Sequence, residues 1–330
     1  MSRENRLRLI RKIESLRQSA VIAYITGDRE NVGTRVAPDI IRIFHQHLEA
    51  LGTKPRIDLF LYTRGGDVLT PWRLVNLIRE YTDYFSVLVP FRAYSAGTLI
   101  CLGANEIVMG KMGELGPIDP SVANAFNPQD PVNPQARIPV SVEDVSSYLA
   151  LAREKAQLSG PELAEAFVVL AEKVHPLALG NVHRNYALIR SLAYRLLRLH
   201  YPPEKEGLMA EIVNSLTERL YSHNHMISRR EARDDIHLHV TYPDAELEKV
   251  LNKLYTDYEA DLQLLEPFNP ALLLTPNQAQ VDFEVSGGII ESSARLDSFV
   301  FNGTVSRSMG PDGLPKVNVE MTSQCWKRLV

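Results

Sequence analysis

Ser95 is the residue of this sequence that is best placed for covalent chemistry. It stands in Ala93-Tyr94-Ser95-Ala96-Gly97, between an apolar run at 86–91 that is typical of a strand and one at 98–104 that is typical of a helix. A serine on a strand-to-helix corner has free backbone N–H groups beside it, which suits a nucleophile. The alternative is a serine that caps the helix, and the pentapeptide taken alone favours that interpretation.

A second strand-to-helix corner changes this balance. Tyr62-Thr63-Arg64-Gly65-Gly66-Asp67 follows the strand-like run 57–61, and its glycine pair can turn the chain while presenting backbone N–H groups to a ligand. Acyl transfer needs a hydroxyl that attacks and amides that stabilise the oxyanion. The two corners together therefore predict an acyl-transfer site. For Asp67 itself we favour a role as cap of the following helix.

The base that would activate Ser95 is left open by the sequence. No histidine occurs between His47 and His175, so a histidine base would have to be brought in by folding. A lysine buried near a serine has a lowered pKa and can accept the hydroxyl proton, which makes Lys111 and Lys155 candidates. Each could equally be an ordinary surface charge. Asp119, in Pro117-Ile118-Asp119-Pro120, could orient a base or belong to a simple turn.

The composition is that of an ordinary globular protein. The chain has 330 residues, 45% of them hydrophobic and 23% charged, with a formal net charge of −4. This balance gives no electrostatic footprint for nucleic acid. The N-terminal segment carries scattered charges and no apolar h-region, so we expect no signal peptide, no membrane anchor and a cytoplasmic location. We interpret its basic residues as the solvated face of an amphipathic helix. The two cysteines lack metal or redox spacing.

The pattern of apolar residues predicts the fold class. Between residues 20 and 110, near-continuous apolar runs alternate with helical segments, as in an α/β fold with a buried parallel sheet. Helical patterns follow from 141 to 265, and β-type alternation returns between 281 and 321. We expect an α/β core with an N-terminal helix at 1–180, a helical extension at 181–266 and a small β-rich C-terminal appendage at 267–330.

Three segments, in this order, resemble the serine dehydrogenase proteinase family. They are Leu61 to Asp67, Val89 to Ile100, and Glu114-Leu115-Gly116-Pro117-Ile118-Asp119-Pro120. The family comprises relatives of signal peptide peptidase A within the Clp protease/crotonase fold. The resemblance covers roughly residues 15–240. It implies a ββα-superhelix core and a serine endopeptidase that acts on peptides or polypeptides without a cofactor.

The same resemblance assigns roles to individual residues. It implies that Ser95 is the nucleophile, that the amides of Gly66 and Ala96 form the oxyanion hole, and that the neighbouring Gly65, Asp67 and Tyr94 contact the substrate. Asp119 stands where Clp proteases carry their catalytic histidine. Relatives of signal peptide peptidase A use a Ser-Lys dyad instead, which makes Lys155 our first choice and Lys111 our second.

Two further expectations concern partners. Because this fold commonly assembles into rings or stacks, we expect a homo-oligomer, with the helices after Val182 as candidate contacts. The sequence leaves open whether a partner ATPase regulates it.

Other classes of function were weighed against the peptidase. A crotonase-like acyl-CoA enzyme would use the same oxyanion hole but needs no serine on the corner. An oligomeric scaffold with an incomplete site is the non-enzymatic alternative. Histidines at 237 and 239 could share one face of a strand, but no third ligand has diagnostic spacing, so we expect no metal site. No glycine fingerprint of a dinucleotide site is present, and we predict no dehydrogenase.

Overall fold

The computed structural model describes residues 3–118, 121–122, 125–130, 132–133, 135–138, 140–218, 222, 225–275, 277–309 and 315–330. These residues form two compact units, one made of 1–115 with 227–330 and one made of 116–226. The units divide the chain at other positions than the expected domains 1–180, 181–266 and 267–330, and that three-part division stays a prediction.

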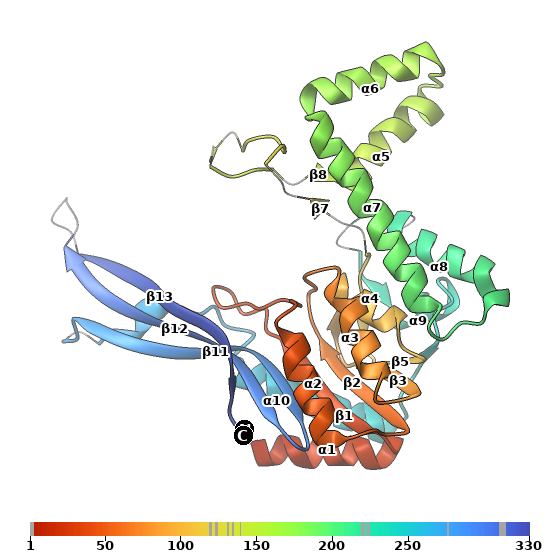
Figure 1. Cartoon of the computed structure of the whole chain (residues 1–330). Coiled ribbons are helices and arrows are strands. Elements are labelled where there is room, and N and C mark those ends of the chain that lie inside the picture. Colours follow the sequence, from red (N-terminus) through yellow and green to blue (C-terminus); the bar gives the residue numbers. More distant parts are fainter. Residues whose placement is uncertain are drawn as a thin grey trace. The chain divides into compact units, whose positions relative to one another are not determined.

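The first unit is built on an eight-stranded sheet with the order β10-β5-β3-β2-β1-β11-β12-β13 (Figure 1). The strands from β10 to β1 are parallel, and β11, β12 and β13 continue the sheet in antiparallel fashion. This mixed α/β architecture agrees with the fold class expected from the sequence. The bounds of the eight strands are β1 Ala20–Thr26, β2 Arg56–Tyr62, β3 Tyr84–Val89, β5 Glu106–Met109, β10 Val240–Thr241, β11 Gln280–Ser292, β12 Leu296–Met309 and β13 Pro315–Arg328.

Helices cover both faces of the parallel strands. All seven residues of β1 are buried, as expected for a parallel strand with helices on either side. A small three-stranded sheet, β4-β6-β9, lies in the same unit. The remaining elements of the unit are α1 Arg3–Arg17, α2 Ile40–Leu51, α3 Thr70–Arg79, β4 Arg92–Ala93, α4 Ala96–Leu102, β6 Glu114–Leu115, β9 Ile227–Ser228, α9 Arg229–Asp234, α10 Ala245–Asp261 and the 3₁₀ turn η3 Pro270–Leu273.

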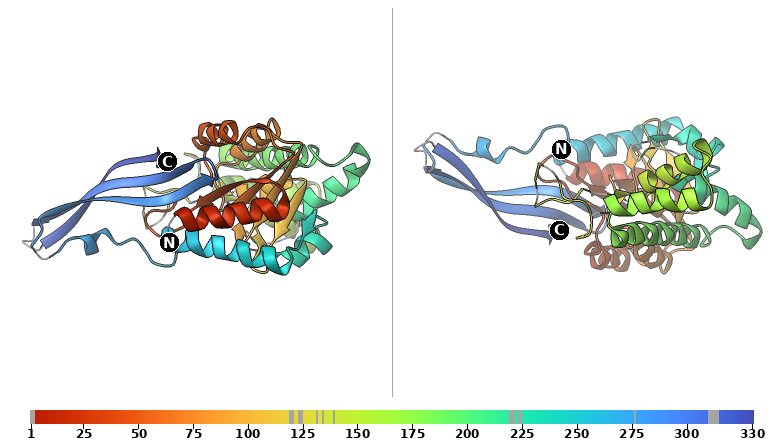
Figure 2. Two further views of the ribbon diagram at one scale, coloured as in Figure 1. Left: turned by 90° about the horizontal axis from the view of Figure 1, so that it is seen from below. Right: turned by 90° about the horizontal axis from the view of Figure 1, so that it is seen from above.

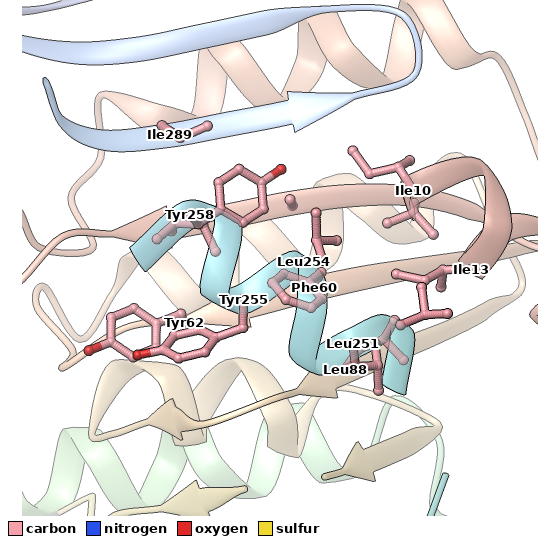
Figure 3. Close-up of a cluster of buried hydrophobic side chains, with 14 of the residues drawn as sticks. Ile10, Ile13, Phe60, Tyr62, Leu88, Leu251, Leu254, Tyr255, Tyr258 and Ile289 are labelled. Carbon is pink, nitrogen blue, oxygen red and sulfur yellow. The ribbon is translucent and has the colours of Figure 1, made fainter. Parts of the chain in front are cut away.

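One hydrophobic core cluster lies between one face of the sheet and the helices α1 and α10, which run side by side (Figures 2 and 3). Alternate residues of each strand point into it, for example Phe60 and Tyr62 of β2, because side chains alternate between the faces of a strand. The apolar stripe of α10 follows the helical spacing of three and four residues: Leu247, Val250, Leu251, Leu254, Tyr255, Tyr258 and Leu262.

Buried ion pairs tie α1 to the rest of this unit. Arg6 is only 4% exposed, and its guanidinium lies 2.7 Å from the Glu291 carboxylate on β11 and 2.8 Å from that of Asp261. The interpretation of the N-terminal basic residues as a solvated helix face is therefore wrong for Arg6. Sequence spacing did not reveal this, because Glu291 is 285 residues away.

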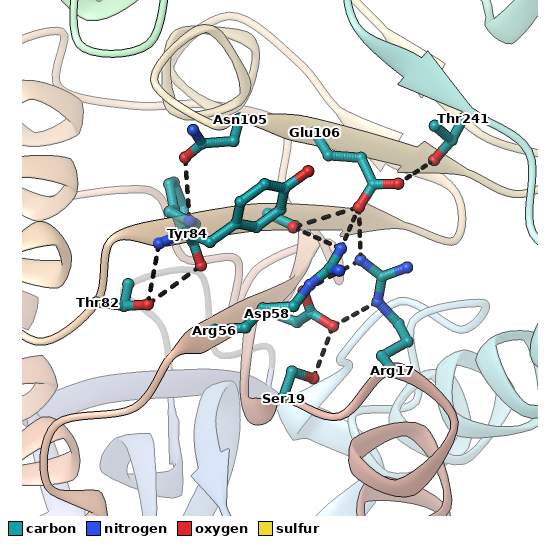
Figure 4. Close-up of polar contacts among 11 residues, drawn as sticks. Arg17, Ser19, Arg56, Asp58, Thr82, Tyr84, Asn105, Glu106 and Thr241 are labelled. Carbon is teal, nitrogen blue, oxygen red and sulfur yellow. Dashed lines mark hydrogen bonds and ion pairs between the residues drawn. The ribbon is translucent and has the colours of Figure 1, made fainter.

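A second polar network closes the edge of the sheet where β2 and β5 begin (Figure 4). Arg17 pairs with Asp58 at 2.5 Å and with Glu106 at 2.8 Å, and Arg56 also pairs with Glu106. Two guanidinium groups thereby compensate the buried carboxylate of Asp58 and the partly exposed one of Glu106, as buried charges require. This network lies at the N-terminal ends of the parallel strands. The candidate site is built at their C-terminal ends.

The C-terminal strands pair in antiparallel fashion, in the region 281–321 where the sequence predicted β-type alternation. The first of them, β11, is one strand with an irregularity between Ser286 and Gly288. β11 pairs with β1, for example Ile290 with Tyr24, so the C-terminal strands continue the central sheet.

The second unit is mainly helical among its described residues. Its long helix α7 packs against α5 and α8. None of the described helices of the whole chain is long and apolar enough to span a membrane. The elements of this unit are β7 Ser121–Val122, β8 Val140–Ser141, α5 Val142–Ala150, the π-helical turn η1 Leu151–Lys155, α6 Pro161–Lys173, α7 Pro176–Leu197, the 3₁₀ turn η2 Pro203–Lys205 and α8 Glu206–Glu218.

Candidate active site

Ser95 occupies a sharp turn between β4 and α4. Its backbone has φ 52° and ψ −109°, a conformation that residues with a side chain rarely adopt. Its side chain caps no N–H of α4, and its hydroxyl has no hydrogen-bond partner among the described residues. The capping alternative therefore finds no support in the structure. A strained, partly exposed serine at the start of a helix is the geometry of a nucleophile elbow.

The glycine pair lies directly against this serine. Gly65 has φ 104°, and a methyl group placed on it would lie 2.9 Å from the Ser95 Cβ and 3.4 Å from the backbone nitrogen of Ala96. Gly66 has φ 155°, and a methyl group there would meet the backbone of Val36, with 2.6 Å to its nitrogen. Both positions combine a glycine-type backbone with a close approach that a side chain would prevent. The structure thus brings the two corners together.

Two backbone N–H groups at this junction have no acceptor within the part of the chain that the structure describes. Within the described residues, neither the N–H of Gly66 nor that of Ala96 donates to an acceptor, whereas the N–H of Gly65 donates to the Thr63 hydroxyl at 3.0 Å. Ala96 is the first residue of α4, where an N–H has no partner within the helix and the dipole is positive. These are the two amides that the family resemblance assigned to the oxyanion hole, and that role stays a prediction.

Thr63 holds the junction together and was not singled out from the sequence. Its hydroxyl accepts from Gly65 and also lies 2.7 Å from the hydroxyl of Thr26, and its methyl group packs on Gly97. Its backbone bridges to the Ser95 corner, because its N–H donates to the Arg92 carbonyl and its carbonyl accepts from Tyr94. The signal in the sequence was weak: a threonine between a strand and a glycine pair.

Charged residues flank the junction at the ends of β1, β2 and β4. The Asp28 carboxylate accepts from the Tyr62 hydroxyl at 2.9 Å and lies 3.7 Å from the guanidinium of Arg92. The Tyr94 hydroxyl donates to Glu114. Burial, together with that carboxylate, raises the pKa of Tyr94 to about 12, so the phenol is neutral near pH 7. Tyr94 is therefore held in place by β6, and its contact with substrate stays a prediction.

Asp67 accepts hydrogen bonds from residues at the start of α3. Its carboxylate accepts from the N–H groups of Leu69 at 3.2 Å and Thr70 at 2.7 Å, and from the Thr70 hydroxyl. This agrees with the capping role that we favoured from the sequence. A carboxylate used in this way also fixes the exit of the chain from the glycine pair.

Among the described residues, no hydrogen bond links the Lys111 amine to Ser95, and the role of Lys111 as base stays a prediction. Lys111 lies in the turn after β5, where its N–H donates to Glu248 of α10 at 2.9 Å. It lines a cavity of about 1110 Å³ together with residues of α1 and α10, such as Arg8 and Lys249, and Ser95 is not part of that lining. These surroundings give Lys111 no contact with the serine hydroxyl.

The other candidate for the base belongs to the second unit. Lys155 is the last residue of the π-helical turn η1 and its side chain is exposed. Asp119 lies outside the described residues. The roles of Lys155 and Asp119 both stay predictions.

A serine, a histidine and an aspartate do meet elsewhere in the first unit, but they are fully enclosed. His47 of α2 lies 2.8 Å from the Ser292 hydroxyl and 3.0 Å from the Asp297 carboxylate, and all three are at most 2% exposed. Burial is the main reason why the pKa of His47 falls to about 4. No substrate can reach this set, so we interpret it as a structural network that joins α2 to β11 and β12.

Comparison with known proteins bears on the family. Residues 1–155 match the model of the ClpP-like SDH-type serine proteinases. The chain is similar to this family over that segment. The resemblance stated from the three sequence segments is confirmed, and with it the ClpP-like character of the α/β core. The matched range contains Ser95, the glycine pair and both candidate lysines.

Individual relatives are more distant. Two uncharacterized proteins of Methanocaldococcus jannaschii, MJ0137 and MJ1495, are each 27% identical to this chain; the alignments cover 69% and 68% of it and 71% and 67% of the relatives. The solved structure of a mutant of the 1510-N membrane-bound stomatin-specific protease is 17% identical, with a TM-score of 0.37 over 66% of this chain and 79% of that one. That likeness is too remote to inform the function of this chain.

Proposed function

We propose that this chain cleaves peptide bonds through an acyl-enzyme on Ser95. The serine oxygen attacks the peptide carbonyl carbon while a base takes the hydroxyl proton. The oxyanion that forms is stabilised by the N–H groups of Gly66 and Ala96. Its collapse breaks the C–N bond, the amine leaves with the proton from the base, and water then hydrolyses the ester by the same steps.

The observation that carries the proposal is the junction of the two corners. The strained Ser95 lies against Gly65. Among the described residues its hydroxyl has no hydrogen-bond partner, and neither do the N–H groups of Gly66 and Ala96 in the two corners. A structural serine at a helix start would normally accept a capping bond, and buried or half-buried N–H groups are normally paired. Both departures from the usual pattern are explained if an acyl group is bound there.

For the base, the proposal takes Lys155 as first choice and Lys111 as alternative. Lys111 lines the cavity beside α1 and α10, and Ser95 is not part of that lining, which supports keeping Lys111 as the second choice. A Ser-Lys dyad requires the lysine amine to be neutral when it accepts the proton, so the complete site must desolvate it.

The proposal is tested by hydrolysis of a fluorogenic peptide library, with product masses determined to locate the bonds cleaved. We expect turnover by the natural chain, loss of at least 10³-fold in Ser95→Ala, and full activity in Ser159→Ala, where an exposed serine in a turn is removed. Hydrolysis that survives in Ser95→Ala would refute the assignment. A folded chain that binds peptides without cleaving them would favour the scaffold alternative.

A further inference from the structure

β13 is an unprotected edge of the sheet. It is the last strand in the strand order, pairs with β12 on one side, and has no strand on its other side within the described part of the chain. Residues 316–325 are all exposed. A long edge of this kind offers a row of free N–H and C=O groups, and it is a template for pairing with another strand.

The regular part of this edge is short and has a defined centre. Opposite β12, Met321 pairs with Gly303 and Ser323 pairs with Asn302, so Thr322 is an extra residue that interrupts the ladder. The strand begins at Pro315. The uninterrupted stretch therefore runs from 315 to 321, and Asn318 is its middle residue.

One face of this stretch is apolar up to the edge. Val317, Val319 and Met321 alternate along the strand and are 45%, 46% and 40% exposed. Val319 pairs with the buried Val305, which belongs to the cluster around Phe283 and Phe301. The hydrophobic layer of the C-terminal strands thus ends without cover at β13.

We propose that β13 pairs with β13 of a second copy of this chain, antiparallel, about a two-fold axis at Asn318. In this register Lys316 lies opposite the partner's Glu320, and Glu320 lies opposite the partner's Lys316. Val317 lies opposite the partner's Val319 on the apolar face. The edge is therefore complementary to itself in charge and in apolar character, as an isologous interface must be.

The neighbouring register with the same faces aligned is poorer. With the axis at Val319, Val317 would lie opposite the partner's Met321, but Lys316 would lie opposite the partner's Thr322 and Glu320 opposite the partner's Asn318. Both ionic pairs would be lost, and the pairing would run across the irregularity at Thr322. Charge and geometry therefore select the same axis.

This interface differs from the contacts expected from the sequence, which lie on the helices after Val182. It joins two eight-stranded sheets into one continuous sheet and removes the exposed edge of both. It does not depend on the chemistry proposed for Ser95, so either can fail without the other.

A charge swap tests the pairing, because exposed residues on an edge strand can be replaced without disturbing the core. The dissociation constant of the full-length dimer is measured by sedimentation equilibrium for the natural chain, Lys316→Glu, Glu320→Lys and the double variant. Each single variant creates two like-charge pairs and should weaken the dimer roughly tenfold. The double variant should regain natural affinity. Single variants without effect, or a double variant as weak as the singles, would overturn the proposal.

Disulfide cross-linking tests the register. In a Cys325→Ser background, which removes the exposed thiol, Asn318→Cys is compared with Val319→Cys under mild oxidation. Directly opposite residues have Cα atoms roughly 4.5–5.5 Å apart, within disulfide range. We expect Asn318→Cys dimers and none for Val319→Cys, whose two copies would be offset along the strands. Equal cross-linking, cross-linking of Val319→Cys alone, or a chain that stays monomeric at all concentrations would contradict the pairing.

Discussion

Replacing His47 should remove a pH dependence of stability that arises from its burial. In the folded chain the pKa of His47 is about 4, compared with 6.5 for the free side chain. Above pH 6.5 the histidine is neutral in the folded and the unfolded chain, so its protonation does not reduce the free energy of unfolding. Between pH 6.5 and 4 the unfolded chain binds a proton that the folded chain does not, so stability falls as the pH falls. The loss approaches about 3 kcal/mol at pH 4.

The assay is urea unfolding at several pH values, followed by tryptophan fluorescence. Both tryptophans, Trp72 and Trp326, lie in the same unit as His47, so the signal reports on the correct part of the chain. His47→Gln keeps an amide that can reach Asp297 and cannot titrate. His45→Gln is the matched control, because His45 is exposed on the same helix.

The result is judged by the difference between the natural chain and each variant, because other groups titrate in all three. As the pH falls from 6.5 to 4, the free energy of unfolding of the natural chain should decrease by up to about 1.4 kcal/mol per pH unit relative to that of His47→Gln. The natural chain and His45→Gln should show the same pH dependence of this free energy. If the natural chain and His47→Gln show the same slope, the argument from burial is refuted.

Two further changes test the junction around Ser95. Gly66→Ala would place a methyl group against the backbone of Val36, so we expect labelling of the serine by a fluorophosphonate to slow at least 100-fold; Gly52→Ala, also at positive φ but with nothing within 4 Å, should label normally, and equal rates for the two would contradict the account. Thr63→Val keeps the shape but removes the hydroxyl that holds Gly65, which should cost about 1–3 kcal/mol of unfolding free energy. An unchanged urea midpoint for Thr63→Val would show that this bond is dispensable.

The sequence predicted the local elements well, because they depend on local patterns. The stripe of α10 and the buried runs of the parallel strands have clear periods, and the structure contains them. The exact start of α2 at Ile40 depends on a contact outside such patterns. Val36 is extended there because it bridges to Gly66, a contact that no local pattern indicates.

Long-range pairings lay beyond the sequence. The burial of Arg6 and the join of β11 to β1 both link the two ends of the chain. Hydrophobic alternation showed that strands exist near the C-terminus, but it does not state which strand they pair with. The self-complementary stretch of β13 likewise required the structure, because the irregularity at Thr322 defines where its regular pairing ends.

For the candidate site, residue types identified the two strand-to-helix corners, and the structure showed that these corners are in contact. The glycine pair and Ser95 were found from composition and their place after strands, whereas the contact between Gly65 and Ser95 required the structure. The base is the part that neither route fixes, because a lysine becomes a base through its surroundings and not through its spacing.

The central claim is that Ser95 is an activated nucleophile. It is tested most directly by intact-mass spectrometry after incubation with a fluorophosphonate, comparing the natural chain with Ser95→Ala, Lys155→Ala and Lys111→Ala. We predict one label on the natural chain and on Lys111→Ala, none on Ser95→Ala, and strongly reduced labelling of Lys155→Ala. A folded natural chain that takes no label, or a label that persists in Ser95→Ala, would contradict the claim.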